Sequence, residues 1–269
     1  TITDYGTSWD NYSSHPDTAP GFTPGKTHFG ESIASNSKGN VCVVGSPGKG
    51  YENNIHEGSP GYVEVFQFVD NNGSNADLSH FHPSKVEYKW SRTLKLDGAN
   101  GVPLSEQHGW HSGHSVDINE AGNIIAVGIP QTQTDHYSGT IGPNNSKYMY
   151  HGLVEIWKDN SGTWSQIGSL SGDYAHNQGT AWNEHQRFGS SVALNGDGLI
   201  MAVGSPFATH QVNAYPGLKP GGYRYQHGRV DIYEYVNGTT WAARGSIQGP
   251  WYKAHNGHRG TFGVSVSLD

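Results

Sequence analysis

Three stretches decide the fold: RFGSSVALNGDGLIMAVGSPFA at residues 187–208, HGRVDIYEY at 227–235 and NGTTWAARGSIQG at 237–249. The first opens with alternating apolar and small residues, which is typical of a strand whose two faces differ. The Asn-Gly-Asp-Gly that follows predicts a tight hairpin, because these residue types tolerate positive φ. The continuous apolar run after it predicts a strand buried on both faces, which ends at Pro206 because proline cannot donate to a sheet.

The second and third stretches complete a four-stranded unit. HGRVDIYEY alternates polar and apolar residues, as a strand does when one of its faces is polar. Asn-Gly-Thr at 237–239 predicts a turn into a fourth strand that runs from Trp241 to Ile247. Four antiparallel strands in about 75 residues are typical of a β-propeller blade. No segment shows the pattern of an amphipathic helix of useful length.

The same unit occurs three times, so a repeat architecture is the strongest prediction. Each copy contains, in one order, Gly-x-Ser, Gly-x-Pro, Gly-x-Val-acid-aliphatic, and a tryptophan six residues before an aliphatic residue. The landmark residues are Gly30, Gly113, Gly189 and Gly263; Gly45, Gly128 and Gly204; Gly61, Gly152 and Gly228; and Trp90, Trp164 and Trp241. We therefore expect an all-β fold of four-stranded antiparallel blades.

The repeat divides the chain into five segments of one propeller-like domain. We expect the end of a preceding blade and a connection at 1–27, full blades at 28–107, 108–186 and 187–260, and the first strand of a further blade at 261–269. Because closed propellers typically contain at least four blades, we expect neighbouring repeats or other copies of the chain to complete the terminal blades.

The repeat resembles a known family. FGSSVAL, GLIMAVGSP and GRVDIYEY, together with HFGESIA, NVCVVGSP and GYVEVFQF, resemble the FG-GAP repeats of integrin-α-type propellers. TWSQIGSL is similar to tryptophan-containing variants in secreted microbial and algal repeat proteins. The resemblance implies a propeller fold and an extracellular location, and such repeats serve adhesion, matrix and enzyme-accessory roles alike.

One feature of the integrin-type repeats is missing. These repeats often carry an Asp-rich calcium loop between their first two strands, and a calcium ion needs six to eight oxygen ligands. The corresponding turns, 36–39, 119–122 and 195–198, hold at most one acid each. We therefore expect plain hairpin turns without calcium.

Composition excludes several classes of function. The formal net charge is −7 and no basic patch occurs, so we expect no nucleic-acid binding. No apolar run approaches the ~20 residues needed to span a bilayer, so we expect no membrane insertion. The single cysteine, Cys42, excludes an intrachain disulfide framework and is expected to be an inert buried side chain. The absence of an initiator methionine and of a signal peptide indicates a processed chain or a fragment.

Histidines supply the candidate metal ligands, although several of the 16 recur in register and are expected to be structural. The sharper group is His108, His111 and His114. The second is His80 and His82, since residues i and i+2 share one strand face. Neither group has Asp, Glu or Cys at diagnostic spacing, so the sequence predicts no metal and no cofactor.

Aromatic residues supply the candidate ligand contacts. The repeated tryptophans are expected to pack between strands, because their place in the repeat is fixed. Aromatic residues on predicted loops are better candidates for contacts with a sugar or a protein. These are Tyr148, Tyr150, Trp182, Tyr215, Tyr223, Tyr225 and Trp251.

The sequence shows no catalytic constellation. Gly-His-Ser-Val-Asp at 113–117 lacks the second glycine of a nucleophile elbow, and Gly-Ser-Pro-Gly-Lys-Gly at 45–50 lacks the pattern of a phosphate loop. Four N-glycosylation sequons lie on predicted turns or loops. Their asparagines are Asn11, Asn72, Asn144 and Asn237.

These observations predict a non-enzymatic, extracellular structural or adhesive repeat module, part of a larger chain or polymeric assembly. One alternative is a propeller module that binds glycans or extracellular proteins through the aromatic loops. Another is an accessory domain of a secreted hydrolase.

Overall fold

The computed structural model describes residues 28–48, 60–70, 88–101, 110–132, 151–172, 186–210, 225–250 and 261–269. Twelve strands form three four-stranded antiparallel sheets. The first contains β1 (Ser32–Ser35), β2 (Val41–Ser46), β3 (Tyr62–Asp70) and β4 (Tyr88–Asp97). The second contains β5 (Ser115–Ile118), β6 (Ile124–Ile129), β7 (Leu153–Asn160) and β8 (Thr163–Ser171). The third contains β9 (Ser191–Leu194), β10 (Ile200–Ser205), β13 (Arg229–Asn237) and β14 (Thr240–Gln248).

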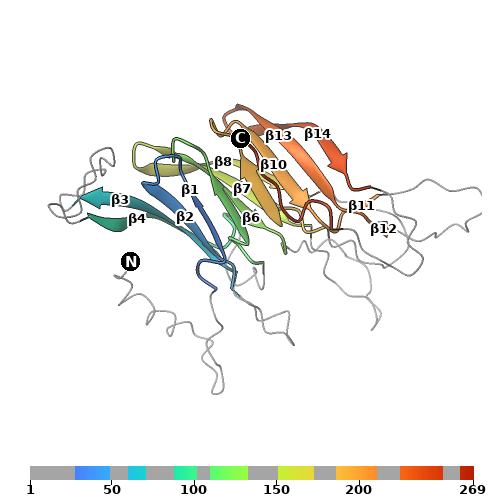
Figure 1. Ribbon diagram of the computed structural model, residues 1–269, viewed down its shortest axis with the longest axis horizontal. Coiled ribbons are helices and arrows are strands. Elements are labelled where there is room, and N and C mark those ends of the chain that lie inside the picture. The colour runs from blue at the N-terminus through green and yellow to red at the C-terminus, as the bar shows by residue number, and fades with distance from the viewer. Residues whose placement is uncertain are drawn as a thin grey trace, which may run out of the picture.

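The predicted all-β, propeller-type architecture is confirmed. Each sheet follows chain order from its inner to its outer strand, and the three sheets stand side by side as successive blades (Figure 1). The inner strands β1, β5 and β9 neighbour one another. We call the sheets blade 1, blade 2 and blade 3 in chain order.

The structure differs from the sequence prediction in several details. The second strand of blade 3 ends at Ser205, directly before Pro206 as predicted, but an unexpected two-stranded ribbon of β11 (Thr209–His210) and β12 (Tyr225–Gln226) follows it. Residues 261–269 form no strand, because no described second strand pairs with them. Cys42 is only partly buried, and desolvation raises the pKa of its thiol.

Apolar side chains fill the space between blades. The continuous apolar run of β6 follows from its position in the middle blade, because successive side chains point to opposite faces of a sheet. Ile125 and Val127 join the core shared with blade 1, whereas Ile124 and Ala126 join the core shared with blade 3. All four side chains are buried.

The Gly-x-Ser and Gly-x-Pro landmarks make one contact between successive units. The Ser115 hydroxyl donates a 2.9 Å hydrogen bond to the carbonyl of Gly189 in the next blade. A Cβ on Gly128 would overlap that same carbonyl, so only glycine allows the two backbones to approach. Ser32 with Gly113 and Ser191 with Gly263 repeat the hydrogen bond at 2.7 and 2.8 Å.

Asparagine closes the turn between the first two strands of each blade. The Asn119 side-chain oxygen accepts hydrogen bonds from the backbone N–H groups of Asn123 and Ile124, at 3.0 and 2.9 Å. Asn36 and Asn195 make the equivalent pairs of bonds. The backbone donors that open each second strand are therefore satisfied by the chain's own amide oxygen.

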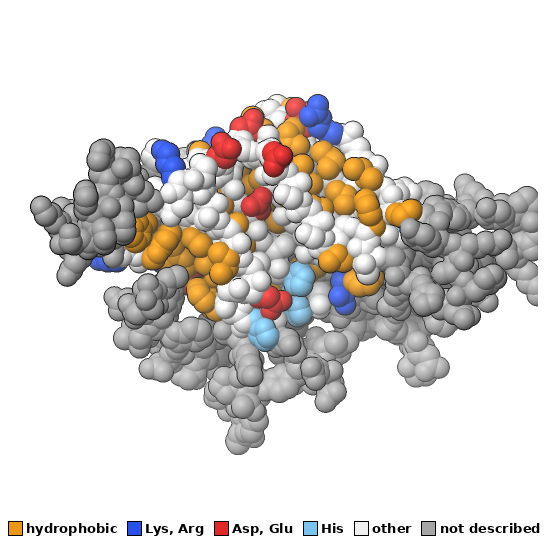
Figure 2. Space-filling model, in the orientation of Figure 1, with side chains coloured by type: hydrophobic (Ala, Val, Ile, Leu, Met, Phe, Trp, Pro, Cys, Tyr) orange, Lys and Arg blue, Asp and Glu red, His pale blue; other side chains and the backbone are white. Residues whose placement is uncertain are grey.

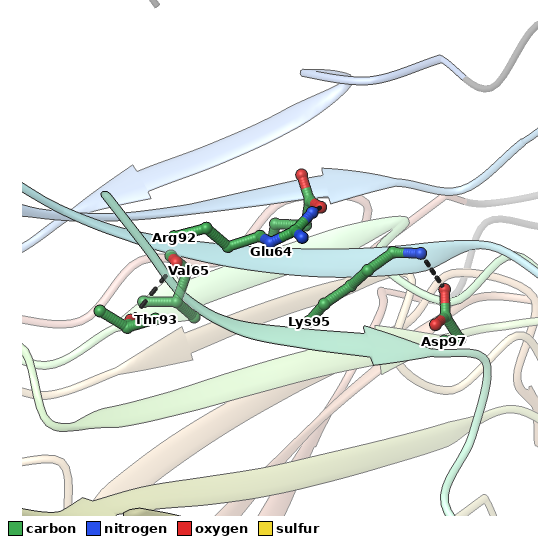
Figure 3. Close-up of polar contacts among 6 residues, drawn as sticks. All are labelled: Glu64, Val65, Arg92, Thr93, Lys95 and Asp97. Carbon is green, nitrogen blue, oxygen red and sulfur yellow. Dashed lines mark hydrogen bonds and ion pairs between the residues drawn. The ribbon is translucent and has the colours of Figure 1, made fainter. Parts of the chain in front are cut away.

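The acid of each Gly-x-Val-acid motif is buried at the middle of its blade. In blade 1 Glu64 pairs with Arg92 from β4 at 2.5 Å, and Thr93 beside it donates a 3.3 Å hydrogen bond to the carbonyl of Val65 (Figure 3). In blade 3 Asp231 pairs with Arg229 at 2.8 Å. In blade 2 Glu155 accepts a hydrogen bond from a backbone N–H.

Candidate functional site

The candidate site lies at the end of the blades where the inner strands begin. Each inner strand is preceded by a four-residue turn that a backbone hydrogen bond closes. The carbonyls of His28, His111 and Arg187 accept these bonds, each 3.1 Å long. These three residues therefore occupy equivalent positions in three successive repeats, and the neighbouring inner strands bring the turns together.

All three turn residues have left-handed backbone. Their φ angles are 56° for His28, 62° for His111 and 52° for Arg187. A side chain in this conformation costs about 1 to 3 kcal/mol, whereas glycine adopts it freely. The repeat thus favours glycine at this position, yet the chain carries two imidazoles and a guanidinium there. This preference for ionisable side chains over glycine points to a use for the side chains themselves.

Two further residues join them, and we call His28, Glu31, His111, His114 and Arg187 the histidine–arginine cluster. The Glu31 carboxylate lies 3.1 Å from Nδ1 of His28 and 3.9 Å from Nδ1 of His114. The guanidinium of Arg187 lies 4.8 Å above the ring of Phe207. Figure 2 shows histidine side chains gathered with an acidic side chain on one face of the molecule.

The electrostatics of the cluster keep its central imidazole neutral. Burial, and to a smaller extent the positive charges of His114, Arg187 and His28, together lower the pKa of His111 to about 4. Burial also lowers the pKa of His114, against an opposing effect of Glu31. At neutral pH His111 and His114 are therefore neutral imidazoles, which can accept a proton, and they lie beside the Glu31 carboxylate and the Arg187 guanidinium.

The sequence prediction found part of this cluster. His111 and His114 do come together, whereas His108, His80 and His82 lie outside the described residues. The sequence prediction missed His28, Glu31 and Arg187, of which His28 and Arg187 occupy the same position in the repeat as His111. Within the described parts of the chain, no group of three or more His, Cys, Asp or Glu side chains is placed to hold a metal ion.

The other predicted contacts are mostly untested. Trp182, Tyr215, Tyr223, Trp251, Asn11, Asn72 and Asn144 lie outside the described residues, and so does the side chain of Tyr225 in β12. Asn237 is exposed at the turn between β13 and β14. The packing role of the repeated tryptophans is confirmed for Trp164 and Trp241, which contact the two interblade cores.

A concave feature separate from the cluster runs along the inner strands. It is a hollow of about 450 Å³ lined by β1, β5, β9 and residues 266–269. Asp117 lies in its wall and accepts a 2.6 Å hydrogen bond from the backbone N–H of Leu194. Burial raises the pKa of this carboxyl above its ordinary value. The hollow has fewer ionisable groups than the histidine–arginine cluster, so the cluster is the stronger candidate site.

No family model and no curated protein matches the chain. Several solved structures resemble it, including the following two. A periplasmic gluconolactonase of Pseudomonas aeruginosa has a TM-score of 0.32 and 12% identity, over 84% of this chain and 58% of that one. A putative 6-phosphogluconolactonase of Bacteroides uniformis has a TM-score of 0.28 and 11% identity, over 82% and 72%. The chain thus spans little more than half the length of the first structure.

These comparisons correct the functional prediction from sequence. Both similar structures carry the names of lactonase-type enzymes, which contradicts the prediction of a non-enzymatic structural or adhesive module. The TM-scores are too low to transfer an activity to this chain. The resemblance to FG-GAP repeats led to the error because repeat landmarks define blades and carry no information on chemistry. Across the described residues, no helix has the length and apolarity to cross a membrane.

Proposed function

We propose that this chain is a hydrolase that acts on an ester-type bond of a small anionic substrate at the histidine–arginine cluster. Arg187 binds the anionic group of the substrate, because a guanidinium is a strong donor to carboxylate and phosphate oxygens. The neutral imidazole of His111 is the general base. Glu31 orients the imidazoles of His28 and His114 through its two oxygens.

The reaction follows from these roles. His111 takes a proton from water, and the water oxygen attacks the carbonyl carbon of the ester. The negative charge that develops on the carbonyl oxygen is stabilised by the positive charge of Arg187. The ester C–O bond then breaks, and the proton on His111 passes to the leaving oxygen. One water is consumed, and one acid and one alcohol are formed.

The observation that carries this proposal is the left-handed backbone shared by His28, His111 and Arg187. Glycine adopts this backbone freely, whereas a side chain in it carries a cost. All three turns instead hold a side chain that can bind an anion or move a proton. Glu31 and His114 are the last residues of two of these turns.

The test is a hydrolysis assay of the purified chain on simple carboxylate-bearing esters and sugar lactones. We expect His111→Gln to lower kcat at least 100-fold, and Arg187→Gln both to raise KM and to lower kcat, because Arg187 binds the substrate and also stabilises the developing negative charge. Because His111 must be neutral to act, kcat/KM should fall as the pH drops through about 4. Ser161→Gly is the matched control, since Ser161 also has left-handed backbone (φ 56°) but lies in the β7–β8 turn.

Wild-type levels of hydrolysis in the His111→Gln variant would refute the assignment of the base. Absence of turnover on all substrates, with no binding of small carboxylates by calorimetry, would refute the site as a whole.

We also propose that the protein acts outside the cytoplasm. The sequon at Asn237 supports this, because its asparagine and threonine are both exposed at the β13–β14 turn. Fractionation of the native cells tests it, and recovery of the protein only in the cytoplasm would refute it.

A further inference from the structure

The interface between blades 2 and 3 depends on a tryptophan. Trp241 of β14 is buried, and its indole N–H donates a 3.1 Å hydrogen bond to the carbonyl of Ile167 in β8. Gly168 makes room for the ring, since a Cβ there would lie 2.5 Å from the indole nitrogen. Ile167 is the extra residue of a β-bulge, because the register between β7 and β8 shifts at this point. A bulge carbonyl and a glycine thus form a seat for the tryptophan.

Blade 3 carries the same seat. Gly245 follows Trp241 by the same spacing as Gly168 follows Trp164, and Arg244 is the bulged residue of β14. Among the described residues, no atom lies within 4 Å of the position that a Cβ on Gly245 would take. Blade 3 therefore has both the bulge and the glycine, and no described residue fills the space beside Gly245.

The side chains around this seat are exposed where their repeat equivalents are covered. Ile247 is 56% exposed, whereas Leu170 at the same place in blade 2 packs against the second interblade core. Leu96 at the same place in blade 1 packs against the first core. We call the surface formed by Gly245, Ile247 and the Arg244 carbonyl the forward face of blade 3.

Phe262 and Gly263 already make part of an interface with blade 3. Ser191 donates its hydroxyl hydrogen bond to the Gly263 carbonyl, as Ser32 and Ser115 do to the following units. Gly228 forms a parallel bridge with Phe262, which matches the bridges Gly61–Ser112 and Gly152–Phe188. Residues 263–268 therefore lie where the inner strand of a next blade belongs.

We propose that the forward face of blade 3 binds a further blade of the same repeat, which starts with residues 263–268 and places its tryptophan beside Gly245. The indole N–H of that tryptophan donates to the Arg244 carbonyl, and apolar side chains of the further blade cover Ile247. This interface continues the two between successive blades, because it shares their inner hydrogen bonds and bridges. It does not depend on the proposed hydrolase activity. A second copy of the chain fits less well, because its own β1 would have to displace residues 263–268.

The experiment extends the chain after Leu268 with a copy of residues 195–249, since residues 263–268 correspond to 189–194. We expect Tm to rise by roughly 5 °C or more, because nearest-neighbour interfaces stabilise repeat proteins. Replacing the added tryptophan by alanine should remove most of this gain.

Ile247→Asp and Val236→Asp form a matched pair of variants. Both side chains are on blade 3 and similarly exposed, at 56% and 53%. Val236 corresponds to Asn160, which is exposed in blade 2 and belongs to neither interblade core. Ile247→Asp should leave the original chain unchanged and abolish the gain in the extended chain, whereas Val236→Asp should leave the gain intact.

Three results would overturn the proposal. The first is an extended chain whose added residues are digested by protease and whose Tm is unchanged. The second is equal loss of the gain in both aspartate variants. The third is dimerisation of the original chain, by light scattering, that Ile247→Asp abolishes, because a second copy would then be the partner.

Discussion

The backbone N–H of Asn100, in the connection that follows blade 1, donates a 2.7 Å hydrogen bond to the carboxylate of Glu155 in blade 2. Glu155 is 2% exposed, and its other oxygen accepts a 3.2 Å bond from the indole of Trp157. Burial raises the pKa of this carboxyl, and the two hydrogen bonds oppose the rise only in part. One buried acid therefore attaches an interblade connection to the sheet that follows it.

This carboxyl makes stability depend on pH. Because its pKa is higher in the folded than in the unfolded chain, its contribution is most favourable below the ordinary pKa of glutamate and is lost as the pH rises through the raised value. Glu155→Gln should remove this dependence while its amide oxygen still accepts from Asn100. Glu155→Ala should cost about 1 to 3 kcal/mol, because the Asn100 donor loses its partner. Urea unfolding between pH 4 and 8 measures both effects, and a wild-type pH profile in Glu155→Gln would contradict the assignment.

The turn residues of the candidate site should trade stability for function. His111→Gly removes a side chain from left-handed backbone, so we expect the free energy of unfolding to stay within about 1 kcal/mol of wild type or to increase. The same variant should lose hydrolysis. Ser161→Gly should match its stability and keep full activity. A large loss of stability in His111→Gly would show instead that the imidazole is a structural residue.

A methyl group at position 128 should disturb the close packing of blade 2 against blade 3. Gly128→Ala places a Cβ onto the Gly189 carbonyl, and overpacking of this kind costs about 1 to 3 kcal/mol. Gly196→Ala is the control, because its new methyl would meet only the movable side chain of Glu120. Thermal unfolding compares the two, and equal melting temperatures would refute the requirement for glycine at position 128.

The asparagine turns should respond to mutation and not to calcium. Asn119→Ala leaves the N–H groups of Asn123 and Ile124 without their acceptor, at a cost of about 1 to 3 kcal/mol. Calcium or EGTA should leave Tm unchanged, since the amide oxygen already fills the turn. A calcium-dependent rise in Tm that EGTA reverses would contradict this.

Glycosylation at Asn237 can be tested by mass. The chain secreted from a eukaryotic host should lose mass on treatment with an N-glycosidase. The mass loss of the Asn237→Gln variant should be smaller by the mass of the glycan at this site. The turn is exposed at the end of the blade opposite the histidine–arginine cluster, so we expect the variant to keep wild-type activity. An unchanged intact mass would eliminate the site.

Much of the fold could be predicted because each landmark has a local cause. The Asn-Gly-Asp-Gly turn, the apolar run of β10 and the alternation of β13 each specify a strand or a hairpin within a few residues. The β-bulge at Ile167 could not be predicted, since a register shift leaves no local pattern. The seat it forms for Trp241 is likewise visible only when two blades are packed together.

The candidate site was harder to predict because it is assembled across repeats. His28, His111 and Arg187 differ in type, so a search for similar residues in register does not select them. Their φ angles show that they occupy one structural position. His111 and His114 were found only because they are close in the sequence, and Glu31 was passed over because its partner His114 lies in another blade.

The left-handed turn at the start of each inner strand also has an evolutionary consequence. Duplication of a repeat copies the turn, and with it a fixed position facing the same shared site. A single codon change then sets the chemistry at that position, while the hydrogen bonds that close the turn use only backbone atoms. New specificities can thus arise at this end of the blades without any change to the residues that specify the fold.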